Sequence, residues 1–401
     1  MEMTEGKRVV LGVTGGIAVY KAAELTRALV KKGVSVKVIM TGHAREFVSP
    51  LTFQVLSGNP VFNDMFSQEH YDMNHISLAE YGDVMVVAPA TANIIGKMAA
   101  GIADDLLSTV LLAVKAPVVV CPAMNDNMYT HGVVQDNMAK LKKHGVQFVA
   151  PGYGELACKT EGVGRLADIA DIVEAVESAW TDKDLRGERI LVTAGPTREP
   201  FDPVRFITNY SSGKMGYALA TMAARRGAEV VLVSGPSSLP VPTGIDFISV
   251  ASAMEMRDAV MTRLEGATAI IKAAAVADYR PAVLSEAKIK KKKGPLTLNL
   301  ERNPDIIAEI GARKGNRVLV GFAMESEDLV ENARAKLIGK NMDLIVANDL
   351  HQAGAGFQGD TNIIKILDPQ GGVEEVPLMD KMDIANRILD RVKILTYAKR
   401  S

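Results

Sequence analysis

The feature that most constrains the fold of this chain is a repeated alternation between apolar runs and amphipathic stretches. In the first half, the apolar runs are rich in valine and isoleucine and occupy residues 8–13, 34–40, 84–88, 117–121 and 146–149. Between them, residues 18–32 and 127–143 have the spacing of amphipathic helices. Continuous apolar strands separated by helices are typical of a parallel sheet that helices cover on both faces.

The same alternation restarts in the second half. A helical pattern at residues 168–180 ends the first half, and a charged, turn-like stretch at residues 181–187 is interpreted as a linker. Apolar runs then return at 189–193, 229–234, 269–273, 317–321 and 343–347, with helical patterns at 215–226, 252–264 and 328–338. The two halves share no motif, so the second is not interpreted as a copy of the first. We predict an α/β protein with two doubly wound Rossmann-like domains and mainly parallel sheets, at residues 1–187 and 188–401.

Charge and composition exclude several classes of protein. The formal net charge is −1 and aromatic residues make up 5% of the chain, which argues against a nucleic-acid partner. Two cysteines cannot form a disulfide framework, and no basic flank with an apolar segment marks a signal peptide. The apolar runs are also far shorter than the ~20 residues that span a bilayer. We predict a cytoplasmic protein with no membrane partner.

A glycine-rich loop follows the first apolar run. Residues 12–18 read Gly-Val-Thr-Gly-Gly-Ile-Ala and precede a helical pattern, so backbone N–H groups and the helix dipole would face an anion. The spacing is not GxGxxG, the fingerprint of dinucleotide sites. We predict a mononucleotide phosphate site, and a plain glycine turn is the alternative.

Further polar groups lie near the ends of the following runs. His75 precedes the run that leads into residues 88–93, and Asn125 follows the next run. Residues 101–107 open a helical pattern, and Cys158 lies in a loop that contains glycines. Because open α/β sheets bind ligands at the carboxyl ends of their strands, we expect several of these groups to share one site.

Together these residues resemble the flavin-containing cysteine decarboxylases, above all through the Pro-Ala-Met-Asn-x-x-Met segment at residues 122–128 and the Cys158 loop. The resemblance implies an FMN cofactor, His75 as an active-site residue, Asn125 as the ligand of the substrate carboxylate and Cys158 as a proton donor. The residues that it implies for FMN binding are Gly15, Gly16, Ile17, Ala18, Thr41, Pro89, Ala90, Thr91, Ala92, Asn93 and Ser108.

The chemistry that the resemblance implies accounts for these residue types. In the family, FMN oxidises the substrate thiol to a thioaldehyde, which accepts the electron pair left when CO₂ departs. A neutral amide at Asn125 would hold the carboxylate without the strong pairing that favours the ground state. A thiol with an ordinary pKa of about 8.5 stays protonated at pH 7, as a proton donor must. The chain departs from the family at Tyr129, usually Trp, and at Lys159, usually Gly, and we expect neither change to abolish activity.

The second half carries its own phosphate-binding signals. Ser211, Ser212 and Gly213 stand directly before a helical pattern, where hydroxyl and N–H groups can bind a phosphate. The spacing is not that of a Walker A loop, and a plain helix cap is the alternative. Asp278 follows an apolar run, and the lysines within residues 288–293 could compensate the charge of a triphosphate.

With this half included, the chain resembles, over nearly its whole length, the bifunctional phosphopantothenoylcysteine decarboxylase/phosphopantothenate–cysteine ligase family of coenzyme A biosynthesis. The resemblance implies that CTP with Mg²⁺ activates 4′-phosphopantothenate as an acyl-cytidylate, which cysteine then attacks, and that Asn209 lies at this intermediate. Ser211, Ser212 and Gly213 would hold the substrate phosphate. The residues implied for CTP are Ala274, Ala275, Asp278, Lys288, Pro304, Asp305, Ile306, Ile307, Phe322, Lys336 and Lys340.

Three other functions remain as alternatives. An oxidoreductase with two nucleotide-binding domains would need the GxGxxG fingerprint, which is missing. A flavin prenyltransferase would not explain Asn125 together with Cys158, and a non-catalytic regulatory relative would not need Cys158. The resemblance also suggests a homo-oligomer, with trimeric decarboxylase packing up to a dodecamer and dimeric ligase domains. No histidine shows the spacing of a paired metal site, so the metal ligands stay unassigned.

Overall fold

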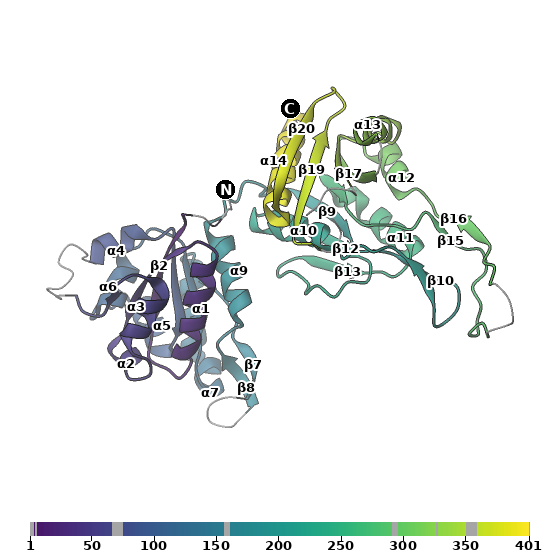
Figure 1. Ribbon diagram of the computed structural model, residues 1–401. Helices are drawn as coiled ribbons and strands as arrows, with labels where there is room; N and C mark the ends of the chain where they lie inside the picture. Colours follow the sequence, from purple (N-terminus) through teal and green to yellow (C-terminus); the bar gives the residue numbers. More distant parts are fainter. Residues whose placement is uncertain are drawn as a thin grey trace. The chain divides into compact units, whose positions relative to one another are not determined.

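The computed structural model describes residues 4, 6–65, 75–155, 161–290, 296–325, 328–349 and 359–400. The chain divides into two compact units, Met1–Thr181 and Asp182–Ser401. Each unit is an α/β structure built around one large sheet (Figure 1). Within the part of the chain that is described, no helix is long and apolar enough to cross a membrane.

The sheet of the first unit is entirely parallel. Its strand order, β3-β2-β1-β4-β5-β6, is that of a doubly wound dinucleotide-binding fold. The chain therefore reverses its direction across the sheet between β1 and β4. The strands are β1 (Arg8–Val13), β2 (Ser35–Met40), β3 (Val61–Phe62), β4 (Val84–Ala90), β5 (Val118–Pro122) and β6 (Gln147–Phe148).

Helices bury both faces of this sheet (Figure 1). Alternate β1 residues enter two different apolar clusters: Leu11 packs with α1 and α9, whereas Val10 packs with α4, α5, α6 and α8. The helices are α1 (Val19–Lys31), α2 (Gly42–Arg45), α3 (Pro50–Ser57), α4 (His75–Tyr81), α5 (Ala92–Ala100), α6 (Leu106–Ala113), α7 (Asp126–Thr130), α8 (Gly132–Lys143) and α9 (Ile169–Trp180). The antiparallel hairpin β7 (Gly152–Glu155) and β8 (Glu161–Arg165) precedes α9.

One helix predicted at residues 127–143 is in fact two helices. His131 separates α7 from α8 because its backbone is extended, with φ −61° and ψ 130°. Its ring Nδ1 accepts the N–H of Val133 at 3.3 Å, which caps the start of α8. The apolar spacing across the break is compatible with one helix, so periodicity alone did not reveal the cap.

The second unit repeats the strand order of the first. Its six parallel strands run β13-β12-β9-β14-β17-β18, so its first strand, β9, takes the place of β1. Two antiparallel strands, β19 and β20, extend the sheet beyond β18. These strands are β9 (Arg189–Ala194), β12 (Glu229–Ser234), β13 (Asp246–Ser249), β14 (Ala269–Lys272), β17 (Val318–Glu325), β18 (Leu344–Asp349), β19 (Thr361–Leu367) and β20 (Val373–Asp380).

The helices of the second unit follow from right-handed crossovers, which place α10 on the face opposite α11, α12 and α13. The last three pack against Ile270 and Leu319 of the sheet in one apolar cluster, while α10 packs against α14. These helices are α10 (Lys214–Arg225), α11 (Ala253–Arg263), α12 (Ile306–Arg313), α13 (Leu329–Gly339) and α14 (Lys381–Arg400). Two small hairpins extend from this unit: β10 (Arg198–Pro200) with β11 (Phe206–Thr208), and β15 (Tyr279–Pro281) with β16 (Leu300–Arg302).

Residues 182–187, which belong to the predicted linker, pack on the second unit. The side chain of Leu185 is fully buried, and its N–H donates to the Arg226 carbonyl at 2.9 Å. The guanidinium of Arg226 in turn binds both oxygens of Asp184 at 2.8 Å. This segment is therefore a structured start of the second unit.

Candidate active sites

In the first unit, hydrogen bonds tie together the loops that follow β1 and β4. The hydroxyl of Thr14 donates to the Pro89 carbonyl at 2.8 Å and accepts the N–H of Thr91 at 3.0 Å. Thr91 in turn caps α5 by accepting the N–H of Ile94. These loops lie at the point where the strand order reverses, which is where open α/β sheets bind their ligands.

The start of α1 at this point is suited to an anion. Ala18 at the N-cap forms no side-chain cap, and the first turn contains no acidic residue. A Cβ added at Gly16 would meet only the Thr91 methyl group, at 3.9 Å, whereas one added at Gly15 would lie 2.3 Å from the His43 Cβ. Gly15 therefore allows close packing within the protein, and Gly16 leaves its backbone open beside the helix start. These features fit the phosphate of a nucleotide cofactor.

The other residues predicted to bind FMN are spread around the same edge of the sheet. Thr41 follows β2 and caps α2, and Asn93 is exposed in the first turn of α5. Ser108 is buried near the start of α6, where its hydroxyl binds Asp105 in a capping box. The Ser108 hydroxyl therefore already has a partner within the protein. Its contact with FMN stays a prediction.

Of the three predicted decarboxylase residues, two are described. Asn125 caps α7, and its Oδ1 accepts the N–H of Asn127 at 3.0 Å. Just before it, Met124 approaches Gly164 of β8 so closely that a Cβ there would meet the Met124 carbonyl oxygen. His75 is the first residue of α4, and Cys158 lies outside the described residues. Cys121 is fully buried at the end of β5, where burial raises the pKa of its thiol.

In the second unit, the loops after β9 and β14 meet at the corresponding reversal of strand order. The Ala275 N–H donates to the Gly195 carbonyl at 3.0 Å, and the Ala275 carbonyl accepts the side-chain amide of Asn209 at 2.9 Å. Gly213, with φ 84°, lies against Gly195, where a Cβ would be 3.2 Å from the Gly195 nitrogen. Asn209 and the loop before α10 therefore reach the same place as the β14 loop.

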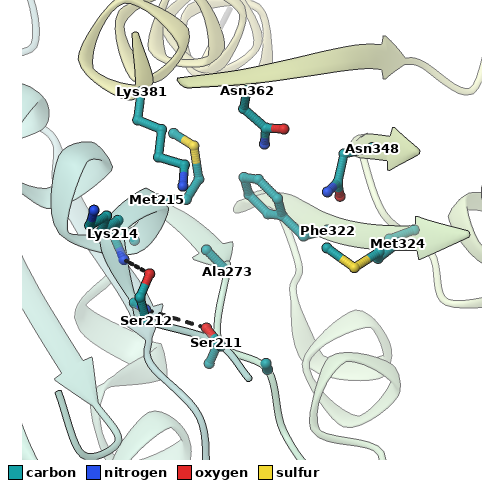
Figure 2. A pocket seen from close by; sticks show the side chains of 15 residues that line it. Ser211, Ser212, Lys214, Met215, Ala273, Phe322, Met324, Asn348, Asn362 and Lys381 are labelled. Carbon is teal, nitrogen blue, oxygen red and sulfur yellow. Dashed lines mark hydrogen bonds between the residues drawn. The ribbon is translucent and has the colours of Figure 1, made fainter. Parts of the chain in front are cut away.

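A pocket of ≈ 150 Å³ opens at this point (Figure 2). Six of the predicted residues line it, namely Ser211, Ser212, Gly213, Ala274, Ala275 and Phe322. The Gly213 N–H donates to the Ser211 hydroxyl at 3.3 Å and the Lys214 N–H to the Ser212 hydroxyl at 3.5 Å, so both hydroxyls turn back onto the loop.

The opposite side of the pocket carries polar groups that sequence reasoning missed. Asn348, Asn362 and Lys381 line it, and Figure 2 shows them across from Ser211 and Ser212. Burial lowers the pKa of Lys381, as does the neighbouring Lys214, which pairs with Asp360 at 2.6 Å. Asn348 ends an apolar strand and could have been found by that position. The other two lie on β19 and α14, where no motif marked them.

Three charged residues meet where α12 begins and α13 ends. Asp305 caps α12 by accepting the N–H of Ala308 at 3.1 Å, and its other oxygen pairs with Lys340 at 2.8 Å. Lys272, at the carboxyl end of β14, interacts electrostatically with both. Burial lowers the pKa of Lys272 to about 8, aided by Lys340 and opposed by Asp305. Sequence reasoning did not single out Lys272, because the run that contains it is otherwise apolar.

The remaining predicted CTP residues do not line the pocket. The backbone of Asp278 accepts the N–H of Asn303 at 2.8 Å, which ties the β14 loop to Pro304 and α12. Ile306 and Ile307 pack into the apolar core. Lys288 and Lys336 are exposed. Among the residues that the structure describes, no cluster of three or more His, Cys, Asp or Glu side chains could hold a metal ion.

Comparison with known proteins places both units in described families. A family model described as "Flavoprotein" matches residues 1–181, and one described as "DNA/pantothenate metabolism flavoprotein C-terminal domain" matches residues 185–395.

Full-length relatives agree with this division. The chain is 49% identical to the "Coenzyme A biosynthesis bifunctional protein CoaBC" of Bacillus subtilis (strain 168), over 98% of each chain. It is 46% identical to the protein of the same name from Vibrio cholerae serotype O1, over 97% of this chain and 98% of the relative. The chain therefore belongs to the CoaBC family of bifunctional decarboxylase–ligase proteins of coenzyme A biosynthesis.

Proposed function

We propose that the first unit decarboxylates 4′-phosphopantothenoylcysteine to 4′-phosphopantetheine with bound FMN. The observation that supports FMN is the uncapped start of α1 beside Gly16, at the reversal of strand order in a Flavoprotein domain. We assign the phosphate to residues 15–18 and expect Thr41, residues 89–93 and Ser108 to surround the rest of the cofactor. When bound, the flavin supplies the reversible thiol oxidation that allows CO₂ to leave without net redox change.

The protein's own residues then orient the substrate and supply a proton. The Asn125 Oδ1 accepts a backbone N–H, and the amide nitrogen is the group that would donate to the substrate carboxylate. We propose that the Cys158 thiol donates the proton taken up by the carbon that has lost CO₂, and that His75 lies beside the reacting groups. A neutral donor at Asn125 holds the carboxylate while still permitting its loss.

We propose that the second unit joins cysteine to 4′-phosphopantothenate, with CTP as the activating nucleotide. The pocket at the reversal of strand order supports this, because the Ser211–Ser212–Gly213 loop, Ala275 and Phe322 line it. Asn209 lies beside it, where its side-chain amide donates to the Ala275 carbonyl. The Ser211–Ser212–Gly213 loop would hold a phosphate, and Asn209 would contact the acyl-cytidylate. Lys288, Lys336 and Lys340 would compensate the charge of the triphosphate.

Several finer features belong to the same proposal. Mg²⁺ would enter as its complex with CTP. The boundary between the two activities would lie within residues 181–187, and the protein would be cytoplasmic. We also propose a homo-oligomer with trimeric decarboxylase units, up to a dodecamer, and paired ligase units.

A pair of substitutions in the full-length chain tests the division of labour. Asn125→Asp should abolish CO₂ release from 4′-phosphopantothenoylcysteine, because a second carboxylate repels that of the substrate, and it should leave pyrophosphate release from CTP unchanged. Lys288→Gln should leave CO₂ release unchanged and slow pyrophosphate release by ~10²-fold. Loss of both activities in either variant, or faster ligation with ATP than with CTP, would contradict the proposal.

A further inference from the structure

The turn between β10 and β11 contains a buried carboxylate, that of Asp202. Its side chain is fully buried, and Oδ1 accepts the N–H groups of Val204 at 2.9 Å and Arg205 at 2.8 Å, which closes the turn. Oδ2 accepts Nε and Nη2 of Arg205 at 3.0 and 2.6 Å. Hydrogen bonds from the Arg205 guanidinium hold the pKa of the Asp202 carboxyl well below its usual range, which favours the ionised carboxylate.

This ion pair also forms hydrogen bonds with a segment that lies far away in the sequence. The N–H of Ile289 donates to Asp202 Oδ2 at 3.2 Å, and the Ile289 carbonyl accepts Arg205 Nη2 at 3.0 Å. Both backbone polar groups of one residue are therefore held by a single ion pair. A further bond, from the Ser285 N–H to the Phe201 carbonyl at 3.2 Å, joins the same two segments.

Residues 285–290, which we name the Lys288 segment, have no helix or strand of their own. Lys288 is exposed and immediately precedes Ile289, whose backbone the ion pair holds. Without regular structure, the position of such a segment depends on specific bonds of this kind. Ordering a free segment costs backbone entropy, and this cost weakens ligand binding unless the segment is already ordered.

We propose that Asp202 is a positioning residue for the Lys288 segment, acting through Arg205 and the backbone of Ile289 to present the Lys288 ammonium group to the nucleotide. The proposal rests on the proposed function, in which Lys288 contacts the triphosphate of CTP. It adds that the lysine is ordered before the nucleotide arrives. In this proposal Asp202 acts only through Arg205 and Ile289, its partners within the protein.

Limited proteolysis tests, without reference to catalysis, whether the Asp202–Arg205 ion pair holds the Lys288 segment in place. Trypsin can cleave after Lys288 only when this segment opens locally and the Lys288–Ile289 peptide bond enters the protease active site. Asp202→Asn in the full-length chain should therefore speed cleavage at this bond by about tenfold or more. Glu301→Gln is the matched control, because Glu301 also pairs with an arginine, Arg280, at 2.8 Å on the neighbouring hairpin, yet binds no atom of Ile289. Cleavage after Lys288 at the wild-type rate in Asp202→Asn would overturn the proposal.

Ligase kinetics then test the positioning role. In Asp202→Asn we expect the KM for CTP to rise by about tenfold with the KM for cysteine unchanged, while Glu301→Gln leaves both unchanged. If Asp202→Asn proves poorly folded, Arg205→Lys is the second variant. It keeps the positive charge but cannot bind Asp202 and the Ile289 carbonyl together, so it should also raise the KM for CTP and leave the KM for cysteine unchanged. Faster cleavage with an unchanged KM for CTP would overturn the positioning role. Failure of the wild-type chain to use CTP would instead contradict the proposed function and leave the proteolysis result standing.

Discussion

Gly15 and Gly16 are neighbours in one loop but differ in what surrounds them. A Cβ at Gly15 would collide with the Cβ and backbone of His43, at 2.3 and 2.7 Å, while a Cβ at Gly16 would make only an ordinary contact with the Thr91 methyl group, at 3.9 Å. We expect Gly15→Ala to destabilise the first unit by about 1–3 kcal/mol through overpacking. Gly16→Ala should keep the wild-type unfolding midpoint and lose bound flavin, because its methyl group would occupy the phosphate site.

Thermal unfolding of the flavin-free proteins and the flavin absorbance per purified chain separate these two effects. A Gly16→Ala variant with a full complement of flavin would show that the phosphate does not bind beside Gly16. A Gly15→Ala variant with wild-type stability would show that His43 moves aside at little cost.

Lys272 leads to a prediction about stability and pH. Its pKa falls from 10.5 to about 8 in the folded protein, so between these values the unfolded chain binds more protons and stability rises with pH. Below pH 8 Lys272 is charged in both states, and its burial weighs against the folded state. Lys272→Met should therefore stabilise the second unit at pH 7, and the gain should shrink as the pH rises from 8 towards 10.5.

Urea denaturation across this pH range checks the sign. Lys365→Met is the control, because Lys365 pairs with Glu375 at 2.6 Å on the β19–β20 strands and has no comparable burial. If Lys272→Met lowers stability at pH 7, the attraction of Asp305 and Asp278 outweighs the cost of burial.

At the scale of elements, Asp305 joins two helices by capping α12 and pairing with Lys340 at the end of α13. Asp305→Asn should keep the cap and lose the charge, which removes the carboxylate that interacts with both Lys340 and Lys272. We expect a loss of stability that Lys272→Met partly rescues.

A double-mutant cycle between Asp305→Asn and Lys272→Met measures this coupling in the free energy of unfolding. The cap alone can be compared through Ser252→Ala in α11, whose hydroxyl accepts the N–H of Glu255 at 3.2 Å. Strictly additive effects of the two substitutions would rule out an electrostatic link between the helix ends.

At the scale of the whole molecule, the start of the second unit decides whether it can stand alone. The Arg226 side chain is 4% exposed and pairs with Asp184 and Asp390. A fragment that begins at residue 188 leaves out Asp184 and Leu185, so we expect it to be about 3–5 kcal/mol less stable than a fragment that begins at residue 182.

Chemical denaturation of the two fragments, at residues 182–401 and 188–401, compares them directly. Asp184→Asn in the longer fragment should account for part of the difference. Equal stability of the two fragments would show that residues 182–187 contribute only a connection.

The sequence by itself determined the features that depend on neighbouring residues. Apolar runs located most strands of the parallel sheets. The loops at Gly15–Gly16 and Ser211–Gly213 could be predicted because a tight turn before a helix needs small residues, and this is a local requirement. The resemblance, carried by residues 122–128 and Cys158, indicated the family that the comparisons show.

Only the tertiary structure decided what depends on residues that are distant in the sequence. It showed that both sheets share one strand order although they share no motif, because pairing is set by packing across the sheet. It also showed that Asn348, Asn362 and Lys381 line one pocket. In the same way, it showed that Asp202 hydrogen-bonds to Ile289 in the Lys288 segment. Burial and opposing charges from separate elements set the pKa of Lys272, and no local pattern encodes them.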